Sequence, residues 1–547
     1  MYRTASAVLV AVALISSASC GGEGERGRIQ GASDEGVQPL YDNLGSLHHE
    51  ITTSVPQAQS YFDQGLRLLY AFNHAESVRA FEEAERLDPS CAMCAWGAAL
   101  ASGPNINDPL DAERAEAAYA AIQRALNNVS NASPRERAFI EAMALRFAAE
   151  PTEDRVSLDS AYAQAMAELA ANYRGDLDAQ VLYADALMNL SPWYYWTEDG
   201  APRPATEEIL ARLEYAMTEN PEHPGACHLY IHAQEAHDPY AAVECAERLA
   251  TLMPGAGHVV HMPGHIYIRV GRYADAIEAN RHAVHADESY FEGPQVNRRG
   301  IYPQGYYPHN YHFMSFAASM AGQSETAIYG ARKVAEKVGP EVAREVGWLE
   351  AITPVVYWTL VTFGQWDQIL AEPLPPEDLR FSLAMAHYAR GVAFAAKGEG
   401  ADARAALDLV TEAAANFPEG DNKTALEIAQ HSLAGEIDLR GGDPNGAIAH
   451  FGIAAELEDG LTYSEPPTWY YPVRQSLGTA LLGAGRAEDA ERVYREDLER
   501  FPDNGWSLYG LYSSLEEQGK AEEAEEVEAR FQIAWQNADV TLTASRF

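Results

Sequence analysis

A pattern of small, large and aromatic residues recurs about every 34 residues along most of the chain, and it constrains the fold more than any other feature of the sequence. Residues 61–89 carry one copy, with Gly65 and Ala84 as small residues, Phe81 as the aromatic residue and Pro89 at the end. This spacing is typical of two helices joined by a turn, because small residues let helices approach closely and proline ends a helix. No long alternating strand pattern competes with it. The sequence therefore predicts an all-α fold.

Similar units fill most of the chain. Clear copies span residues 264–283, 318–331, 434–454, 478–502 and 519–531, and looser copies span residues 91–173 and 379–417. The repeats resemble the tetratricopeptide (TPR) family. That resemblance implies a right-handed solenoid of about ten helix–turn–helix repeats with a concave groove. We expect an N-terminal array over residues 55–365, which holds a histidine-rich groove, and a C-terminal array over residues 366–547.

Four shorter stretches are similar to exported bacterial TPR lipoproteins. They are residues 72–76, 91–97, 257–267 and 308–313. This resemblance supplies no reaction. The general family implies a protein-binding scaffold, which is an expectation about class and not about a site.

The N-terminus has the features of a targeting segment. Residues 5–15 form an apolar run that is too short to span a bilayer as a mature helix. The small residues around Cys20 resemble a bacterial lipobox with Cys20 as the lipidated residue, whereas cleavage after Ala18 is the alternative. We predict a signal peptide over residues 1–20 and a tether and lead-in over residues 21–54. The mature protein is then exported, either periplasmic or anchored to the outer membrane.

Charge and cysteine content limit the partners and the compartment. The formal net charge of −41 repels nucleic acid and anionic lipid, so we expect no nucleic-acid partner and membrane contact only through a lipid on Cys20. An exported chain can form disulfides. Cys227 and Cys245 are placed to join two neighbouring helices. Cys91 and Cys94 are interpreted either as two core residues or as a local bridge.

Histidines are concentrated in one part of the chain. Eleven of the seventeen lie within residues 223–312. His228 and His232 are four residues apart, as are His261 and His265, and residues at that spacing share one face of a helix. The spacing therefore predicts two histidine pairs that each point in one direction.

The TPR resemblance implies that these pairs face the groove. In that family the first helix of each pair lines the groove at its second, fifth, ninth and twelfth positions. Aligned on the repeats, the residues that take these positions in three successive units are His228, His232, Glu235, His258, His261, His265, His309 and His312. Seven histidines and one carboxylate would then converge.

Such a cluster predicts a metal site. A histidine pair on one helix turn chelates an ion, a neighbouring helix completes the set, and imidazole-rich sets suit Cu, Fe or Zn. We predict one or two transition-metal ions and a metal-dependent enzyme, either oxidative or hydrolytic. Glu235 is the candidate general base, and Arg269 is the candidate for holding a carboxylate or phosphate on the bound molecule. Asn280 is interpreted either as an orienting partner of a ligand histidine or as a satisfied buried amide.

Other interpretations of the groove stay open. The alternative function is a lipid-anchored TPR scaffold that binds a peptide or an envelope protein. Neutral histidines could also bind an acidic peptide, sense pH or be purely structural. Residues 190–204, 289–308 and 464–472 break the repeat period. We expect the second of these to act as a wall or lid, because histidine-bearing helices flank it.

Overall fold

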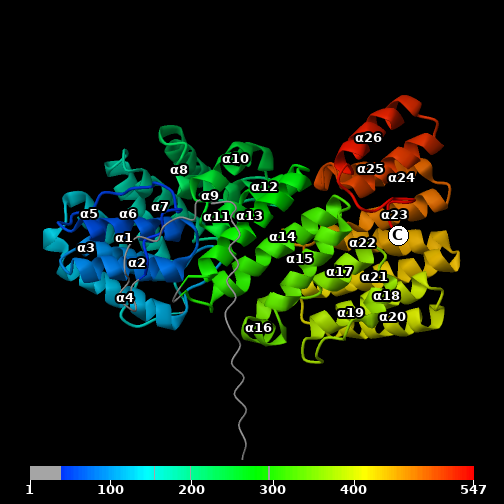
Figure 1. Ribbon diagram of the computed structural model, residues 1–547, viewed down its shortest axis with the longest axis horizontal. Helices are drawn as coiled ribbons and strands as arrows, with labels where there is room; N and C mark the ends of the chain where they lie inside the picture. The colour runs from blue at the N-terminus through cyan, green and yellow to red at the C-terminus, as the bar shows by residue number, and fades with distance from the viewer. Residues whose placement is uncertain (1–37, 153, 198, 294–295) are drawn as a thin grey trace, which may run out of the picture.

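A computed structural model describes residues 38–547 apart from residues 153, 198 and 294–295. Over this part of the chain the protein is an all-α solenoid of packed helix pairs, as predicted, and no strand forms among the described residues. The helices follow one another from the N-terminal part on the left of Figure 1 to the C-terminal part on the right. The predicted signal peptide and Cys20 lie outside the described residues, and the number of repeats stays a prediction.

The helices fall into three consecutive groups along the solenoid. The first comprises α1 (Pro56–Tyr70), α2 (His74–Leu87), α3 (Ala92–Ser102), α4 (Ala112–Asn127), α5 (Pro134–Ala144), α6 (Val156–Asn172), α7 (Leu177–Met188) and α8 (Thr206–Glu219). The second comprises α9 (Pro224–Gln234), α10 (Val243–Leu252), α11 (Gly257–His261), α12 (Pro263–Arg269), α13 (Tyr273–Phe291), α14 (Tyr307–Met320), α15 (Ser324–Lys337) and α16 (Pro340–Glu345). The third comprises α17 (Val355–Thr362), α18 (Trp366–Ala371), α19 (Arg380–Ala396), α20 (Gly400–Ala415), α21 (Asp421–Gly441), α22 (Pro444–Asp459), α23 (Val473–Gly483), α24 (Ala487–Arg500), α25 (Gly505–Glu517) and α26 (Ala521–Ala534).

Glycines at the repeat positions let paired helices pack closely, as the sequence pattern requires. A Cβ atom on Gly65 of α1 would lie 2.8 Å from the ring of Phe81 on α2. A Cβ atom on Gly478 of α23 would lie 2.3 Å from the ring of Tyr494 on α24. Both distances are shorter than a carbon–carbon contact, so a larger residue at either position would push the pair of helices apart.

The solenoid also makes contacts between units that are far apart in the sequence. The indole nitrogen of Trp506 on α25 donates to the backbone oxygen of Ser319 on α14 at 2.8 Å. At the other end, the backbone N–H of Asn297 lies 3.4 Å from a carboxylate oxygen of Glu76 on α2. A simple repeat array contacts only its sequence neighbours. The additional contacts bring two distant parts of this chain to the middle group of helices.

The segment predicted as a loop at residues 289–308 is shorter than expected. Helix α13 continues to Phe291, and a π-helical turn at Tyr302–Tyr306 leads directly into α14. The two other predicted interruptions are present, because no long helix forms between α7 and α8 or between α22 and α23. The proposed boundary between two arrays at residue 366 stays a prediction.

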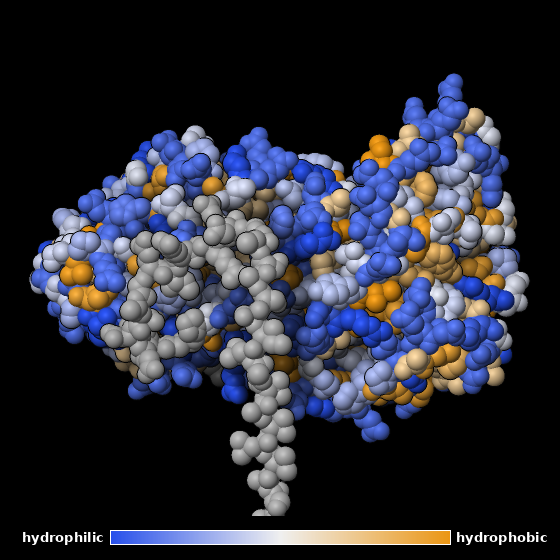
Figure 2. All heavy atoms as spheres, in the orientation of Figure 1, coloured by the Kyte–Doolittle hydropathy of each residue, from blue (hydrophilic) through white to orange (hydrophobic). Residues whose placement is uncertain are grey.

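Both cysteine pairs form disulfides, so the local bridge is the correct one of the two interpretations of Cys91 and Cys94. Cys227 and Cys245 connect α9 to α10, and Cys91 and Cys94 form a local bridge at the start of α3. None of the described helices has the length and apolarity that a bilayer span requires. Hydrophilic residues cover much of the face shown in Figure 2, with apolar residues between them mainly over the C-terminal helices.

Candidate metal centre

Six histidines form two neighbouring groups of three inside the middle part of the solenoid. In each group the nitrogens that would serve as ligands lie within 4.8 Å of one another. The first set, which we call the α9 set, consists of His228, His232 and His258. The second set, which we call the α14 set, consists of His261, His265 and His309. Helices α9, α11, α12 and α14 therefore bring together six of the seven histidines that the sequence predicted.

Two histidines of the α9 set are held by the nitrogen that faces away from the set. Nδ1 of His228 donates to the backbone oxygen of Tyr70 at 2.7 Å, and Nδ1 of His232 lies 3.2 Å from a carboxylate oxygen of Glu235. The Nε2 atoms of both rings are buried and have no hydrogen-bond partner among the described residues. Neither nitrogen of His258 has a partner there either. Buried nitrogens without partners are costly unless something binds them.

In the α14 set an amide fixes the orientation of one ring. Nδ2 of Asn280 donates to the backbone oxygen of Ala276 at 2.8 Å, so Oδ1 of Asn280 is the acceptor for Nδ1 of His261 at 2.7 Å. His261 therefore carries its hydrogen on Nδ1 and leaves Nε2 bare, 2.9 Å from Nε2 of His265. Of the two interpretations of Asn280, its contacts match the orienting partner.

Two buried carboxylates contact the histidines, and one of them touches both sets. Glu235 lies 3.2 Å from Nδ1 of His232 and 2.8 Å from Nδ1 of His265. Glu465, from the segment between α22 and α23, lies 2.9 Å from the same nitrogen of His265. Burial opposes the positive charge of His265 and the negative charge of Glu235. The two carboxylates nevertheless raise the pKa of His265 to about 10. His265 and His232 lower the pKa of Glu235 to about 2. His265 is the one ring of the six that is charged at neutral pH.

The other five rings are neutral at neutral pH. Burial is the main cause, because removing an imidazolium from water is costly, and neighbouring histidines add to it. Together these effects lower the pKa of the remaining members of the two sets, which are His228, His232, His258, His261 and His309. Neutral imidazole is the form that binds a metal ion.

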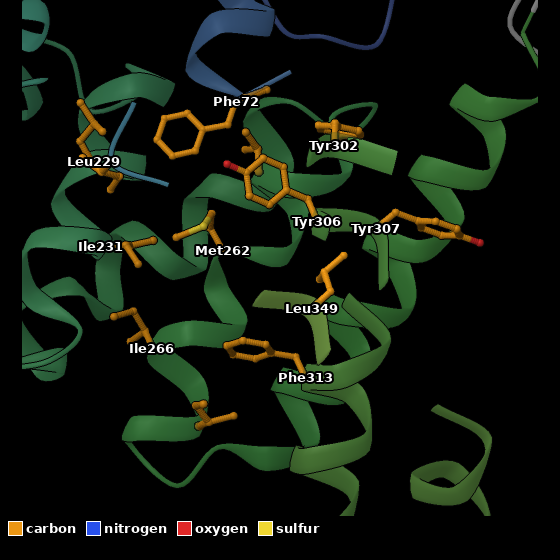
Figure 3. Packing of buried hydrophobic residues seen from close by; sticks show 14 of the residues in the cluster. Phe72, Leu229, Ile231, Met262, Ile266, Tyr302, Tyr306, Tyr307, Phe313 and Leu349 are labelled. Carbon is orange, nitrogen blue, oxygen red and sulfur yellow. The ribbon is translucent and has the colours of Figure 1, made fainter. Parts of the chain in front are cut away.

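Aromatic rings enclose both sets. Phe72, in the turn between α1 and α2, packs on His228 with ring centres 4.4 Å apart, and Tyr306 packs on His258 at 4.5 Å. Figure 3 shows these two aromatic residues reaching the same region from separate segments, with Phe313 of α14 below them. The ring centre of Phe313 lies 4.5 to 4.8 Å from the ring centres of all three histidines of the α14 set. The histidines therefore face an interior from which bulk water is largely excluded.

Two of the enclosing aromatic residues have unusual backbone conformations. Phe72 has a φ of 54° and Trp193 a φ of 68°, and the ring centres of these residues lie 5.9 Å and 5.2 Å from that of His232. A bulky residue in the left-handed region costs energy, and such residues persist where the surrounding structure requires them. Both strained positions therefore coincide with the α9 set.

Two predicted site residues lie beside the sets rather than in them. His312 stacks on Tyr470 with ring centres 5.5 Å apart, and burial lowers its pKa to about 3. It belongs to neither group of three. Arg269 donates from Nε to the backbone oxygen of Glu235 at 3.2 Å and stacks over Tyr463. The roles of His312 as a ligand and of Arg269 in holding a substrate stay predictions.

Three contributors were missed in the sequence, namely Tyr70, Phe72 and Glu465. Each comes from a unit far from the histidine repeats, so helical spacing carries no signal for it. Residues 72–76 carry part of the family resemblance, and residues 464–472 interrupt the repeat period. Nothing in the sequence shows that either segment contacts the histidines. His74, which lies near Phe72, is not a member of either set, because its ring contacts the backbone of Ala101 and the amide of Asn105.

A further group of His49, Asp176 and Asp178 is held largely by protein partners, although Nε2 of His49 and one oxygen of Asp176 have no hydrogen-bond partner among the described residues. Asp178 lies 2.7 Å from Nδ1 of His49 and accepts from the hydroxyl of Tyr70 at 2.7 Å, while Arg135 lies 3.2 Å from Asp176. The guanidinium of Arg135 and the occupied oxygens of Asp178 disfavour a cation here. The group instead ties the lead-in to α7 and fixes Tyr70, whose backbone oxygen holds His228.

Comparisons with known proteins add information on the fold only. No protein-family model matches the sequence, and no curated protein matches it. Similar solved structures include the human IFIT1 dimer with m7Gppp-AAAA, which is 13% identical over 88% of this chain and 91% of that chain, with a TM-score of 0.31. The P58(IPK) TPR domain is 11% identical over 85% and 99% of the chains, with a TM-score of 0.21. The Cut9–Hcn1 hetero-tetramer of APC/C is 11% identical over 88% of both chains, with a TM-score of 0.26. These scores carry no conclusion about what this chain binds.

Proposed function

We propose that this chain is an exported metalloprotein that binds transition-metal ions through the α9 and α14 sets and uses them in metal-dependent catalysis. The two sets offer five neutral imidazoles in a buried site, and His265 would become a sixth ligand when an ion displaces its proton. Three protein ligands with a remaining open position are typical of catalytic ions, whereas structural zinc sites are usually closed by four protein ligands.

The observation that carries this proposal is the way four of the rings are oriented. In His228, His232, His261 and His265, Nδ1 contacts a backbone oxygen, an amide oxygen or a carboxylate. Metal-binding histidines almost always use their second nitrogen in this way, because the contact fixes the tautomer and aims the other nitrogen at the ion. The 2.9 Å between Nε2 of His261 and Nε2 of His265 is also close to the separation of two nitrogens bound to one ion at about 2.0–2.1 Å each.

The donor set restricts the choice of ion. Imidazole nitrogens suit Cu, Fe, Ni and Zn, while Mg²⁺ and Ca²⁺ prefer oxygen ligands. The carboxylates of Glu235 and Glu465 contact the histidines and thereby stabilise their orientation. We therefore assign Glu235 an orienting role in addition to the predicted role of general base, since its two oxygens already contact His232 and His265.

The alternative function, a scaffold that binds a peptide at the same histidines, is less consistent with the packing. His228 and His261 have no exposed surface, and Phe72 and Phe313 cover the two sets. An extended peptide would have to displace these rings to reach the imidazoles. A protein partner of the solenoid would therefore bind at another surface.

The test is the metal content of the purified chain after reconstitution with Cu, Fe or Zn and desalting. The unmodified protein should retain near-stoichiometric metal. A variant with His232→Gln and His261→Gln, which removes one ligand from each set, should lose most of it while keeping its helical circular dichroism.

The matched control replaces two exposed histidines on α13, with His282→Gln and His285→Gln. This control should retain as much metal as the unmodified protein. Equal metal content in both variants, or no retained metal in the unmodified protein, would contradict the proposal.

A further inference from the structure

The two sets lie close enough for their ions to share a ligand. The ring centres of His232 and His265 are 5.6 Å apart, and those of His258 and His261 are 5.9 Å apart. Each of these pairs joins a ring of the α9 set to a ring of the α14 set. These distances between sets are similar to the 4.9 Å between His228 and His232 within the α9 set. The six rings therefore form one continuous cluster and not two separate sites.

The charges around the cluster leave a deficit of negative charge once ions are bound. Two divalent ions would bring four positive charges, and the imidazoles contribute none when they act as neutral ligands. Glu235 and Glu465 are the carboxylates that contact the histidines, and they supply at most two negative charges. Arg269 lies 3.9 Å from Glu465, and its positive charge offsets part of the negative charge of the carboxylates. Uncompensated charge in an interior is costly, so a bound anion would stabilise the loaded centre.

The walls limit the size of that anion. Phe72, Tyr306 and Phe313 pack directly on the imidazoles, with ring centres 4.4 to 4.8 Å away. Five of the six histidines are buried, and His309 is partly buried. Contacts this close exclude a large organic molecule, because the rings are already in van der Waals contact, and limit a ligand to a few atoms at most.

We propose that the two sets hold two ions side by side and that a small anion of one to three atoms, such as hydroxide or azide, binds between them. This inference rests on the proposed metal binding and adds the number of ions and the class of ligand. The substrates of this site would then be small molecules that bind at a paired metal centre.

The experiment uses the full chain loaded with Cu(II), with azide as the probe for the shared position. Copper content is measured by elemental analysis, and the amount of isolated Cu(II) is measured from the integrated electron paramagnetic resonance signal. We expect two copper ions per chain, loss of most of the signal on addition of azide because the bridged ions couple magnetically, and one azide bound for every two copper ions.

Two variants locate the effect. His309→Gln removes a ligand from the α14 set only, so this variant should hold one copper ion whose signal persists in azide. His282→Gln changes an exposed histidine on α13 outside both sets, so it should behave as the unmodified protein does.

The outcomes separate this inference from the proposal on which it rests. Two copper ions whose signal stays complete in azide, or a single ion in the unmodified chain, would overturn the paired centre but leave metal binding intact. Failure of the unmodified chain to retain any ion would overturn both.

Discussion

Replacing Glu235 by glutamine should weaken metal binding in one of the two sets. The two carboxylate oxygens contact Nδ1 of His232 and Nδ1 of His265, one in each set. An amide of the same shape has one oxygen, so it can accept from only one of the rings. Its NH₂ group would face the other Nδ1–H, and that ring would have to move its hydrogen to Nε2, the nitrogen that should bind the ion.

The expected size of the effect follows from this geometry. Loss of such an orienting partner typically lowers metal affinity about 10- to 100-fold, which is about 1.4–2.8 kcal/mol per ion. One ion should therefore weaken in Glu235→Gln, in the set whose ring faces the NH₂ group, while the ion in the other set keeps its affinity. The assay is a competition titration against a chromogenic chelator at neutral pH, with circular dichroism to confirm that the variant folds.

A nearby buried acid provides the matched control. Burial raises the pKa of Glu458 to about 8, so this side chain is protonated at neutral pH and resembles an amide already. Glu458→Gln should leave both affinities unchanged. The orienting role is refuted if Glu235→Gln binds ions as tightly as the unmodified chain. If this variant keeps its full metal content but loses catalytic turnover, Glu235 is the general base alone.

Three further predictions concern the supports of the site. Asn280→Ala should lower the metal affinity of the α14 set about 10- to 100-fold in the same titration, because Nδ1 of His261 loses the amide oxygen that orients the ring. An unchanged affinity would contradict this. Replacing both cysteines of the α9–α10 disulfide by serine should lower the free energy of unfolding by about 2–4 kcal/mol in urea titrations, since the bridge limits the unfolded chain; an equal midpoint would show that it does not contribute. Although burial opposes protonation, Asp178 raises the pKa of His49, so the stability from this pair is fully present below about pH 6.5 and is lost as the pH rises through the raised value. The stability difference between the unmodified chain and Asp178→Asn should therefore shrink as the pH rises above about 6.5, and a constant difference would exclude the linkage.

The sequence was sufficient to predict the helix pairs, because their packing depends on local spacing. Gly65 against Phe81 shows this well, since both residues lie within one repeat and the repeat period places them. The same periodicity placed His228 with His232 and His261 with His265, because residues four apart share a helix face.

The remainder of the site depends on contacts that no local pattern encodes. Glu465 approaches His265 from a segment 200 residues later in the sequence, and Phe72 approaches His232 from 160 residues earlier. These approaches arise from the way the solenoid packs on itself. The position of His312 shows the converse, because correct helical spacing brought this ring near His309 but Tyr470 holds it outside the sets.

The most direct test of the central claim is anomalous diffraction from crystals of the full chain grown with Cu, Fe or Zn and measured at the absorption edge of the ion. We predict one anomalous peak among the three histidines of the α9 set, about 2.0–2.1 Å from the Nε2 atoms of His228 and His232. A second peak should lie among the three histidines of the α14 set, at the same distance from the Nε2 atoms of His261 and His265. Peaks confined to exposed histidines, or no peak inside the solenoid, would contradict the assignment of these six residues as a metal centre.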